Sequence, residues 1–217
     1  MPKVVDPEER RQEIAEAVFR VARRDGLELA SLRNVAEEAG LAIGSVRHYF
    51  AGQADIMNFA MNLFALRAGK RLLARAAGLR VPGPDAPPAA HVATLEAMFA
   101  EVLPIDAERR EEAEVWLAFT TSARTRSELA PLALEMHDDL RRVIGRVLTG
   151  AAGVGVLRPG LDPDEEAGRM HALIDGMTLH AILQPDRLGP SGLAAMLRRH
   201  VCAITTVRAE ELPPLPE

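Results

Sequence analysis

Residues 32–50, LRNVAEEAGLAIGSVRHYF, constrain the fold of this chain more than any other part of its sequence. Apolar residues recur at helical spacing through the first half of this stretch, and Ser31 stands before them, where its hydroxyl can cap a helix. Gly40 follows them, because glycine tolerates the left-handed backbone that commonly ends a helix. A further short run, residues 43–49, has the same spacing. The stretch predicts two short helices joined by a tight turn.

The second of these helices has a mixed outward surface. Helical spacing turns Val46 and Phe50 inward, and it leaves outward Gly44, Ser45, Arg47, His48 and Tyr49. Glycine permits close approach, and the other four side chains offer hydrogen bonds to phosphates or base edges, which suits a DNA major groove. Two helices about a glycine are also a common corner in all-α proteins. A helix before the pair and a long helix directly after it favour DNA binding.

The pattern SLRNVAEEAGLAIGSVRHYF, followed by a helix that opens near Gln53, resembles the helix-turn-helix of the TetR family of transcriptional regulators over about residues 8–64. Residues 175–183, DGMTLHAIL, are similar to the choline/betaine-type repressors of that family. The resemblance implies an all-α homodimer that binds a palindromic double-stranded operator and an unidentified small-molecule effector, with no cofactor. Repression relieved by the effector is the family's usual mode. The DNA-contacting residues expected here are Ser31, Arg33, Gly44, Ser45, Arg47, His48, Tyr49 and Gln53.

Two positions depart from the family pattern, and both lower the operator affinity that we expect. Ala42 stands where the family usually carries Ser or Thr, so the second helix loses a side-chain cap at a cost of about 1 kcal/mol. Gln53 stands where lysine is common. An amide can contact a phosphate, but it releases no counterion.

The charge balance also bears on DNA binding. The net charge is −5, and residues 1–53 carry eight Lys/Arg against nine Asp/Glu. DNA binding must therefore depend on where single basic residues lie, and the candidates are Lys3, Arg10, Arg11, Arg33 and Arg47.

Bulk features limit the other classes of protein. Cys202 is the only cysteine, so an intrachain disulfide is excluded. No apolar run approaches the roughly 18 residues of a membrane span, and the first residues lack a signal-peptide core. We expect a cytoplasmic protein that does not bind membranes.

Helical spacing recurs along the whole chain, and no segment shows useful strand alternation. The fold class predicted is all-α with about nine helices. Asp6 and Asp162 each precede a proline and can cap a helix, and Ser127 can cap another that reaches about residue 149. We expect a helix-turn-helix DNA-binding domain at 1–53, a helical ligand-binding and dimerisation domain at 54–209, and a frayed tail at 210–217.

No catalytic constellation stands out. The chain has no glycine-rich phosphate loop, no GxSxG and no Cys/His zinc spacing, so we expect no enzyme and no metal site. His171 and Asp175, four residues apart, can bond to each other or line a cavity, but they are too few to hold a metal. An effector pocket among the middle helices would use Met98, Phe99, Trp116, Phe119, Thr120, Met136, His137, Met177 and His180. Methionine and aromatic residues at helical spacing more usually belong to a plain core.

The last two helices predict an assembly. The helix near residues 163–183 is apolar nearly all round, which indicates burial on both sides. Together with the final helix it can form a four-helix bundle across a two-fold axis, through Met170, Ile174, Leu183, Leu193, Met196, Leu197, Val201 and Ile204. The alternative is that both helices only close the core of one chain. Two rival functions are an all-α dimer whose N-terminal helices bind another protein and, less favoured, a helical-bundle enzyme.

Overall fold

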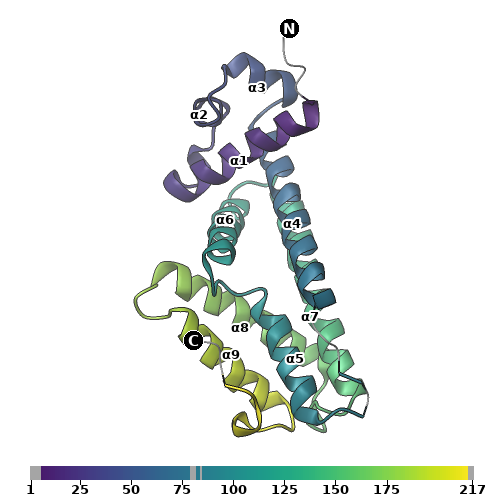
Figure 1. Ribbon diagram of the computed structural model, residues 1–217. Helices are drawn as coiled ribbons and strands as arrows, with labels where there is room; N and C mark the ends of the chain where they lie inside the picture. Colours follow the sequence, from purple (N-terminus) through teal and green to yellow (C-terminus); the bar gives the residue numbers. More distant parts are fainter. Residues whose placement is uncertain (1–5, 79–81, 84, 215–217) are drawn as a thin grey trace. The chain divides into compact units, whose positions relative to one another are not determined.

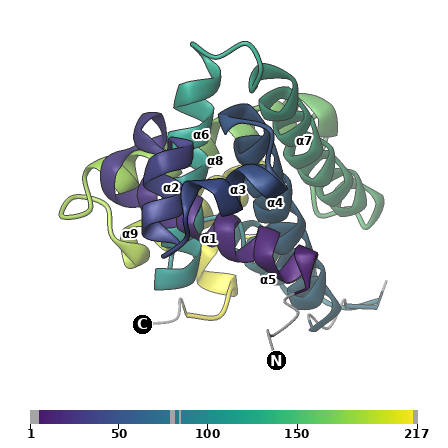
Figure 2. The same cartoon turned by 90° about the horizontal axis from the view of Figure 1, so that it is seen from above.

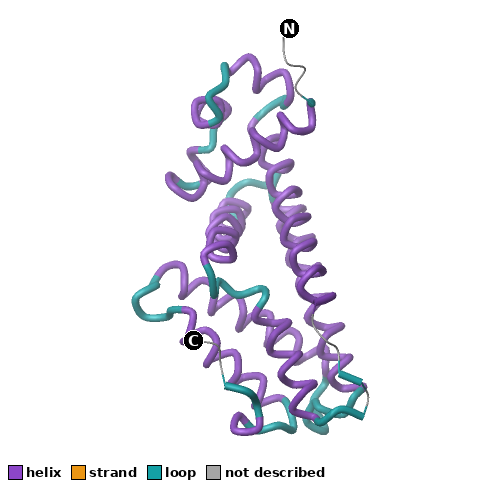
Figure 3. Tube along the Cα trace, viewed as in Figure 1, coloured by secondary structure: helices purple, strands orange, loops and turns teal. Residues whose placement is uncertain are grey.

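The computed structural model describes residues 6–78, 82–83 and 85–214, and within them every regular element is helical (Figures 1 and 3). The helices are α1 (Pro7–Asp25), α2 (Leu32–Glu38), α3 (Ile43–Tyr49), α4 (Gln53–Gly78), α5 (Pro88–Ala100), α6 (Ala107–Ala123), α7 (Ala130–Gly153), α8 (Pro163–Leu183) and α9 (Pro190–Ile204), with the 3-10 turns η1 (Leu27–Leu29) and η2 (Ala209–Glu211). The predicted all-α class is confirmed. Lys3 lies outside the described residues.

The two helix starts that an Asp-Pro pair predicts are confirmed. The Asp6 carboxylate accepts a hydrogen bond from the backbone N–H of Glu8 at 2.9 Å, and the Asp162 carboxylate accepts one from Asp164 at 2.7 Å. The proline that follows each aspartate lies in the first turn, where its missing N–H costs no helical hydrogen bond.

The helix α7 begins and ends later than its sequence predicts. Ser127 lies in the turn after α6 instead of capping a helix, and α7 starts at Ala130. It continues past residue 149 because Ala151 and Ala152 favour helix, and its last turn is followed by Gly155 at φ 73°. The predicted loop is correspondingly shorter.

The chain divides into two compact units, and α4, α6 and α7 each contribute to both. The first unit comprises the described residues up to Gly69 together with Glu114–Met136. Within it α1 contacts η1, α2 and α3, as the view in Figure 2 shows for the three helices. Its core includes Ile14, Val18, Val21, Val35, Val46, Phe50, Ile56, Met61 and Phe119. The first turns of α4 therefore pack with α1–α3, although the functional division at residue 53 stays a prediction.

The second unit comprises Lys70–Ala113 and the described residues from His137 onward. Its core joins α5, α7, α8 and α9 through Leu95, Phe99, Ile144, Leu148, Met170, Met177, Leu193, Leu197 and Val201. Where α5 meets α9, Arg198 and Glu96 form a largely buried ion pair with Nη2 and Oε2 2.9 Å apart. Of the stretch predicted to fray, residues 215–217 lie outside the described residues, and residues 210–214 contain the end of η2 and a buried Leu212 that packs on this core.

None of the helices described is both long and apolar enough to cross a membrane.

Candidate nucleic-acid interface and effector region

The helices α2 and α3 form the compact pair that their sequence predicts. The Ser31 hydroxyl caps α2 by accepting a hydrogen bond from the backbone N–H of Asn34 at 3.2 Å. Gly40 takes the left-handed conformation, with φ at 66°, and turns the chain between the two helices. Val46 and Phe50 are fully buried. The local fold follows directly from the spacing of these residues.

The outward face of α3 is largely as predicted. Gly44, Ser45, Arg47 and His48 are exposed. Tyr49 is the exception, because it is only half exposed and its ring packs beside the core of the first unit while meeting the His48 ring edge-on at 5.1 Å. At the start of the helix the structure adds an apolar side chain to this face, Ile43, which the sequence interpretation left out.

The absence of a side-chain cap on α3 is confirmed. Ala42 occupies the N-cap position in extended conformation and makes no side-chain hydrogen bond.

The charges of the first unit are arranged unevenly around its surface. Arg20 and Arg24 of α1 both pair with Glu38 at the end of α2, and their hydrogen bonds lower the pKa of the Glu38 carboxyl below its usual value. Arg33 and Arg47 are exposed and form no ion pair with any residue that the structure describes. The basic side chains on α2 and α3 therefore remain available to an anion, although residues 1–53 carry no net positive charge.

Gln53 has a partner inside the first unit. Its side-chain amide donates a hydrogen bond to the backbone carbonyl of Ala30 at 3.0 Å. This bond ties the start of α4 to the residue just before the cap of α2. A phosphate contact from Gln53 stays a prediction, and it has to compete with this internal bond.

Arg11 holds the end of α3 in place. Its guanidinium carbon lies 4.9 Å from the centre of the Phe50 ring and 4.3 Å from that of Phe59, and the two rings are 5.5 Å apart. The buried Nε of Arg11 has no hydrogen-bond partner among the described residues, so the cation is held by the aromatic faces. This contact links α1, the residue that follows α3, and α4.

The residues predicted for an effector pocket fall into several environments. Phe119 and Met136 pack in or against the core of the first unit, and Phe99 and Met177 belong to the core of the second. Met98 and Trp116 are half-buried, whereas Thr120, His137 and His180 are exposed. The Thr120 hydroxyl is used locally, since it donates to the Trp116 carbonyl at 2.8 Å. The pocket itself stays a prediction.

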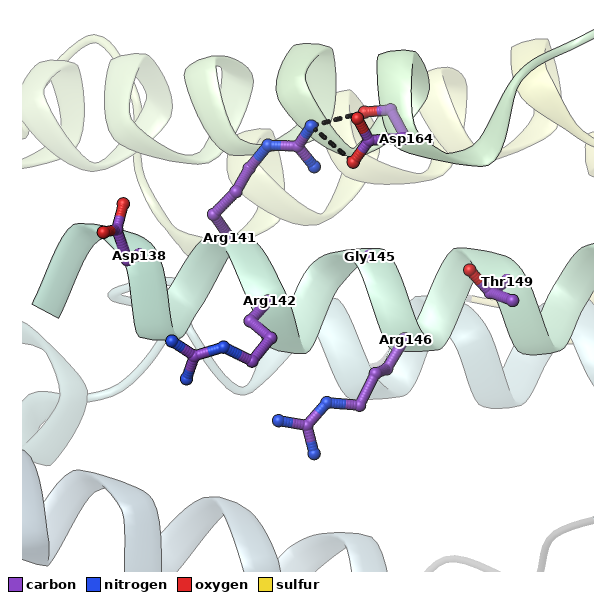
Figure 4. A pocket seen from close by; sticks show the side chains of 7 residues that line it. All are labelled: Asp138, Arg141, Arg142, Gly145, Arg146, Thr149 and Asp164. Atoms are coloured by element: carbon purple, nitrogen blue, oxygen red, sulfur yellow. Dashed lines mark hydrogen bonds and ion pairs between the residues drawn. The ribbon is translucent and has the colours of Figure 1, made fainter. Parts of the chain in front are cut away.

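The second unit has a surface groove of about 590 Å³ along α7, at a different set of residues. It is lined by Asp138, Arg141, Arg142, Gly145, Arg146, Thr149 and Asp164 (Figure 4). Figure 4 shows Arg141 reaching across to α8, where its Nη2 donates to the carbonyl and the carboxylate of Asp164 at 2.5 and 3.0 Å. With both charges on its walls, this groove differs from the apolar pocket that the sequence predicts.

Two histidines of the second unit stack on each other. The rings of His137 and His171 lie 4.5 Å apart, and His171 Nε2 is 3.8 Å from the Asp175 carboxylate. Burial lowers the pKa of His171 and raises that of Asp175. Both shifts favour the neutral forms, and no metal-binding group of three such residues occurs within the described chain. His171 is buried, but the Asp175 side chain is 39% exposed, so the two residues meet at the edge of the core at a separation longer than a hydrogen bond.

The residues predicted for the dimer interface separate into two sets. Met170, Ile174, Leu193, Leu197, Val201 and Ile204 are buried within a single chain. Leu183 and Met196 are 64% and 43% exposed. The large apolar side chains of α8 and α9 that are exposed are therefore these two and Leu179.

Comparison with known proteins places these features in context. Residues 91–206 match the family described as BetI-type transcriptional repressor, C-terminal. The HTH-type transcriptional regulator PksA of Bacillus subtilis (strain 168) is 35% identical over 204 residues, which cover 94% of each chain. A transcriptional regulator from Rhodococcus sp. Rha1, known from its crystal structure, has a TM-score of 0.74 at 30% identity, covering 91% of this chain and 98% of that one. A protein of Saccharomonospora viridis solved in complex with choline shares the fold, with a TM-score of 0.78 at 22% identity over 93% of this chain and all of that one.

Proposed function

This chain belongs to the TetR family of transcriptional regulators and has a BetI-type C-terminal region, and from this premise we propose that it is a cytoplasmic repressor that binds a two-fold symmetric operator as a homodimer. The family consists of regulators, so the chain is not an enzyme. The observation that carries the proposal is the outward face of α3, where Arg47 is exposed and unpaired within the described chain.

The ion pairs of the first unit explain how residues 1–53, which carry no net positive charge, can bind DNA. Glu38 is neutralised by Arg20 and Arg24, so it does not oppose the approach of phosphates to α3. Arg47 and His48 then meet the base edges or phosphates of the major groove, with Gly44 allowing close approach. Few phosphates are neutralised, so non-specific affinity is modest and recognition depends on the major-groove contacts.

The homodimer that we propose uses the surface of α8 that remains exposed. Ala172, Gly176, Leu179 and Leu183 follow one another at spacings of four, three and four residues, which places them on one face of the helix. A methyl group added at Gly176 would meet none of the described atoms within 4 Å, apart from its chain neighbours and its own helix backbone, so packing inside the chain does not require a glycine there. A small residue at this point lets a second helix approach closely. Met196 of α9 extends the same kind of surface.

We also propose a small-molecule effector in the region of residues 54–209. An effector that binds two states of the dimer with different affinity shifts their populations and so changes operator affinity. Choline is the first compound to test, because the Saccharomonospora viridis protein was solved with it. Release of the selected duplex by millimolar choline, with no release by an equal concentration of sodium chloride, is the expected response, and equal effects of the two salts would reject choline.

Selection from random duplex DNA tests the central proposal. The expected product contains two inverted half-sites whose centres lie about one helical turn apart, roughly 34–36 Å, because a two-fold dimer presents two copies of α3. Recovery of unrelated sequences, or of a single unsymmetrical site, contradicts it. A protein-interaction role for the N-terminal helices would give no enrichment at all.

A further inference from the structure

The first residue of α3 has an exposure that its spacing does not predict. Ile43 precedes Val46 by three residues and Phe50 by seven, which is the spacing of one helix face. Val46 and Phe50 are buried, yet Ile43 is 39% exposed. The helix begins here, and Ala42 before it is also exposed. A short apolar strip therefore lies on the outside of the unit at the start of α3.

Ile43 lies beside the basic residue that we expect to reach DNA. Arg47 lies four positions after Ile43, which corresponds to about 6 Å along the helix axis and about 40° around it. Both side chains are exposed, so they share one edge of the outward face. A partner that binds Arg47 on this face therefore lies close to Ile43.

Base edges in the major groove offer an isoleucine one apolar partner. Hydrogen-bond donors and acceptors make up most of the groove floor, and the C5-methyl group of thymine is the apolar group on it. We infer that Ile43 contacts the C5-methyl group of a thymine in each operator half-site, within about two base pairs of the base that Arg47 contacts. The inference rests on the proposed function, since it takes α3 as the helix that enters the groove.

Exposure of a single isoleucine is ordinary on a protein surface, so exposure alone does not identify a contact. The position identifies it, because the side chain is exposed one helical turn from the exposed Arg47. A contact with the thymine methyl group also predicts an effect on binding that a purely structural role of Ile43 does not predict. Removing that methyl group from the DNA must weaken binding, and it must do so only while the isoleucine is present.

Replacement of thymine by uracil removes the methyl group and leaves base pairing intact. The experiment uses the full chain and the duplex recovered by selection, with each thymine pair of the two half-sites replaced by uracil in turn. Dissociation constants are measured for the parent, for Ile43→Ala and for Leu66→Ala. Leu66 is a matched control, because it is an exposed leucine in the same compact unit, about 20 Å along α4 from its first residue.

The expected result is one thymine position at which uracil weakens binding by the parent about threefold to tenfold. In Ile43→Ala the same uracil should change binding by less than about twofold, while Leu66→Ala should keep the parental loss. Thermal melts show whether each variant is folded. If Ile43→Ala does not fold, Ile43→Ser takes its place in the series, and the same loss of the uracil penalty is expected.

Two outcomes overturn the inference and leave the proposed function standing. One is a selected duplex in which every uracil substitution is neutral for the parent. The other is an equal uracil penalty in the parent and in Ile43→Ala, which assigns the methyl contact to another residue. Failure of the parent to select any duplex overturns the contact together with the proposed function.

Discussion

The outward face of α3 and the apolar faces of α8 and α9 differ in how well the sequence predicts which of their residues are exposed. In α3 a buried Val46 stands next to an exposed Arg47, so the polar residues mark the surface by contrast. In α8 apolar residues occur all round the helix, and Met170 is buried while Leu183 is 64% exposed. Helical spacing identifies a surface only where a helix has a polar side to set against its apolar one.

The largest expected effect tests which chain covers the apolar side of α9. Leu197→Glu places a charge inside the core of the second unit, so we expect a loss of at least about 3 kcal/mol of folding free energy and extensive unfolding of that unit. Circular dichroism during thermal melting measures the change.

Met196→Glu is the control for that variant, because the neighbouring side chain is 43% exposed and should tolerate the charge. A Leu197→Glu protein that stays folded as a monomer with parental helix content would show that a partner chain, and not its own core, covers Leu197.

The next effect concerns the exposed side of α8. A double variant, Leu179→Glu with Leu183→Glu, should fold normally and weaken dimerisation by about a hundredfold or more, which corresponds to roughly 3 kcal/mol and to the loss of one or two interface hot spots. Sedimentation at micromolar concentration gives the mass. Leu134→Glu, at an exposed leucine of α7, should leave the dimer intact. If the double variant remains as dimeric as the parent, the interface lies elsewhere.

A smaller change is expected at the recognition surface itself. Arg47→Ala should cost roughly 1–3 kcal/mol of operator binding because a guanidinium contact to a base or phosphate is lost, and it should not change the melting temperature. Arg20→Ala is matched to it, since Arg20 is paired with Glu38, and Arg24 remains to hold that carboxylate. Fluorescence anisotropy with the selected duplex compares the two, and equal losses would remove Arg47 from the reading surface.

Gln53 offers a test of salt dependence. Gln53→Lys removes the hydrogen bond to Ala30, at a net cost of about 1 kcal/mol of stability. If the new ammonium reaches a phosphate, the slope of log affinity against log salt steepens by up to about one unit for each phosphate that it neutralises. Gln53→Met loses the same bond without adding charge, so it should share the stability loss and keep the parental slope. An unchanged slope in Gln53→Lys shows that position 53 does not reach the DNA backbone.

The smallest effect concerns pH. Because burial lowers the pKa of His171, the folded chain binds fewer protons there than the unfolded chain, so stability falls as the pH drops below about 6.5. Burial raises the pKa of Asp175, which partly offsets this loss of stability at low pH. Burial lowers the pKa of His200, which adds to the loss. We expect the melting temperature of His171→Gln to fall less than that of the parent between pH 7 and pH 5.5. If the melting temperature of His171→Gln falls as much as that of the parent or more, the loss of stability at low pH does not come from His171.

The sequence predicts the structure of α2 and α3 more closely than the rest of the fold. Ser31, Gly40 and Val46 act locally, so a cap, a turn and a buried face can be derived without the remainder of the chain. The exposure of Ile43 could not be predicted, because its spacing is that of the buried residues and only the start of the helix leaves it uncovered.

The second unit shows why the burial of single residues is harder to predict from the sequence. Leu197 and Leu183 are the same residue type at similar helical spacings, but long-range packing buries one and leaves the other exposed. The Gln53 bond to Ala30 and the Arg11 contact with Phe59 likewise join residues far apart in the chain. No local pattern specifies such contacts.

Hydroxyl-radical footprinting on the selected duplex tests most directly the claim that two copies of α3 read a symmetric operator. The parent should protect two segments related by a two-fold axis, about one helical turn apart, and Arg47→Ala should lose both together. A single protected segment, or two segments that Arg47→Ala leaves unchanged, would contradict the claim.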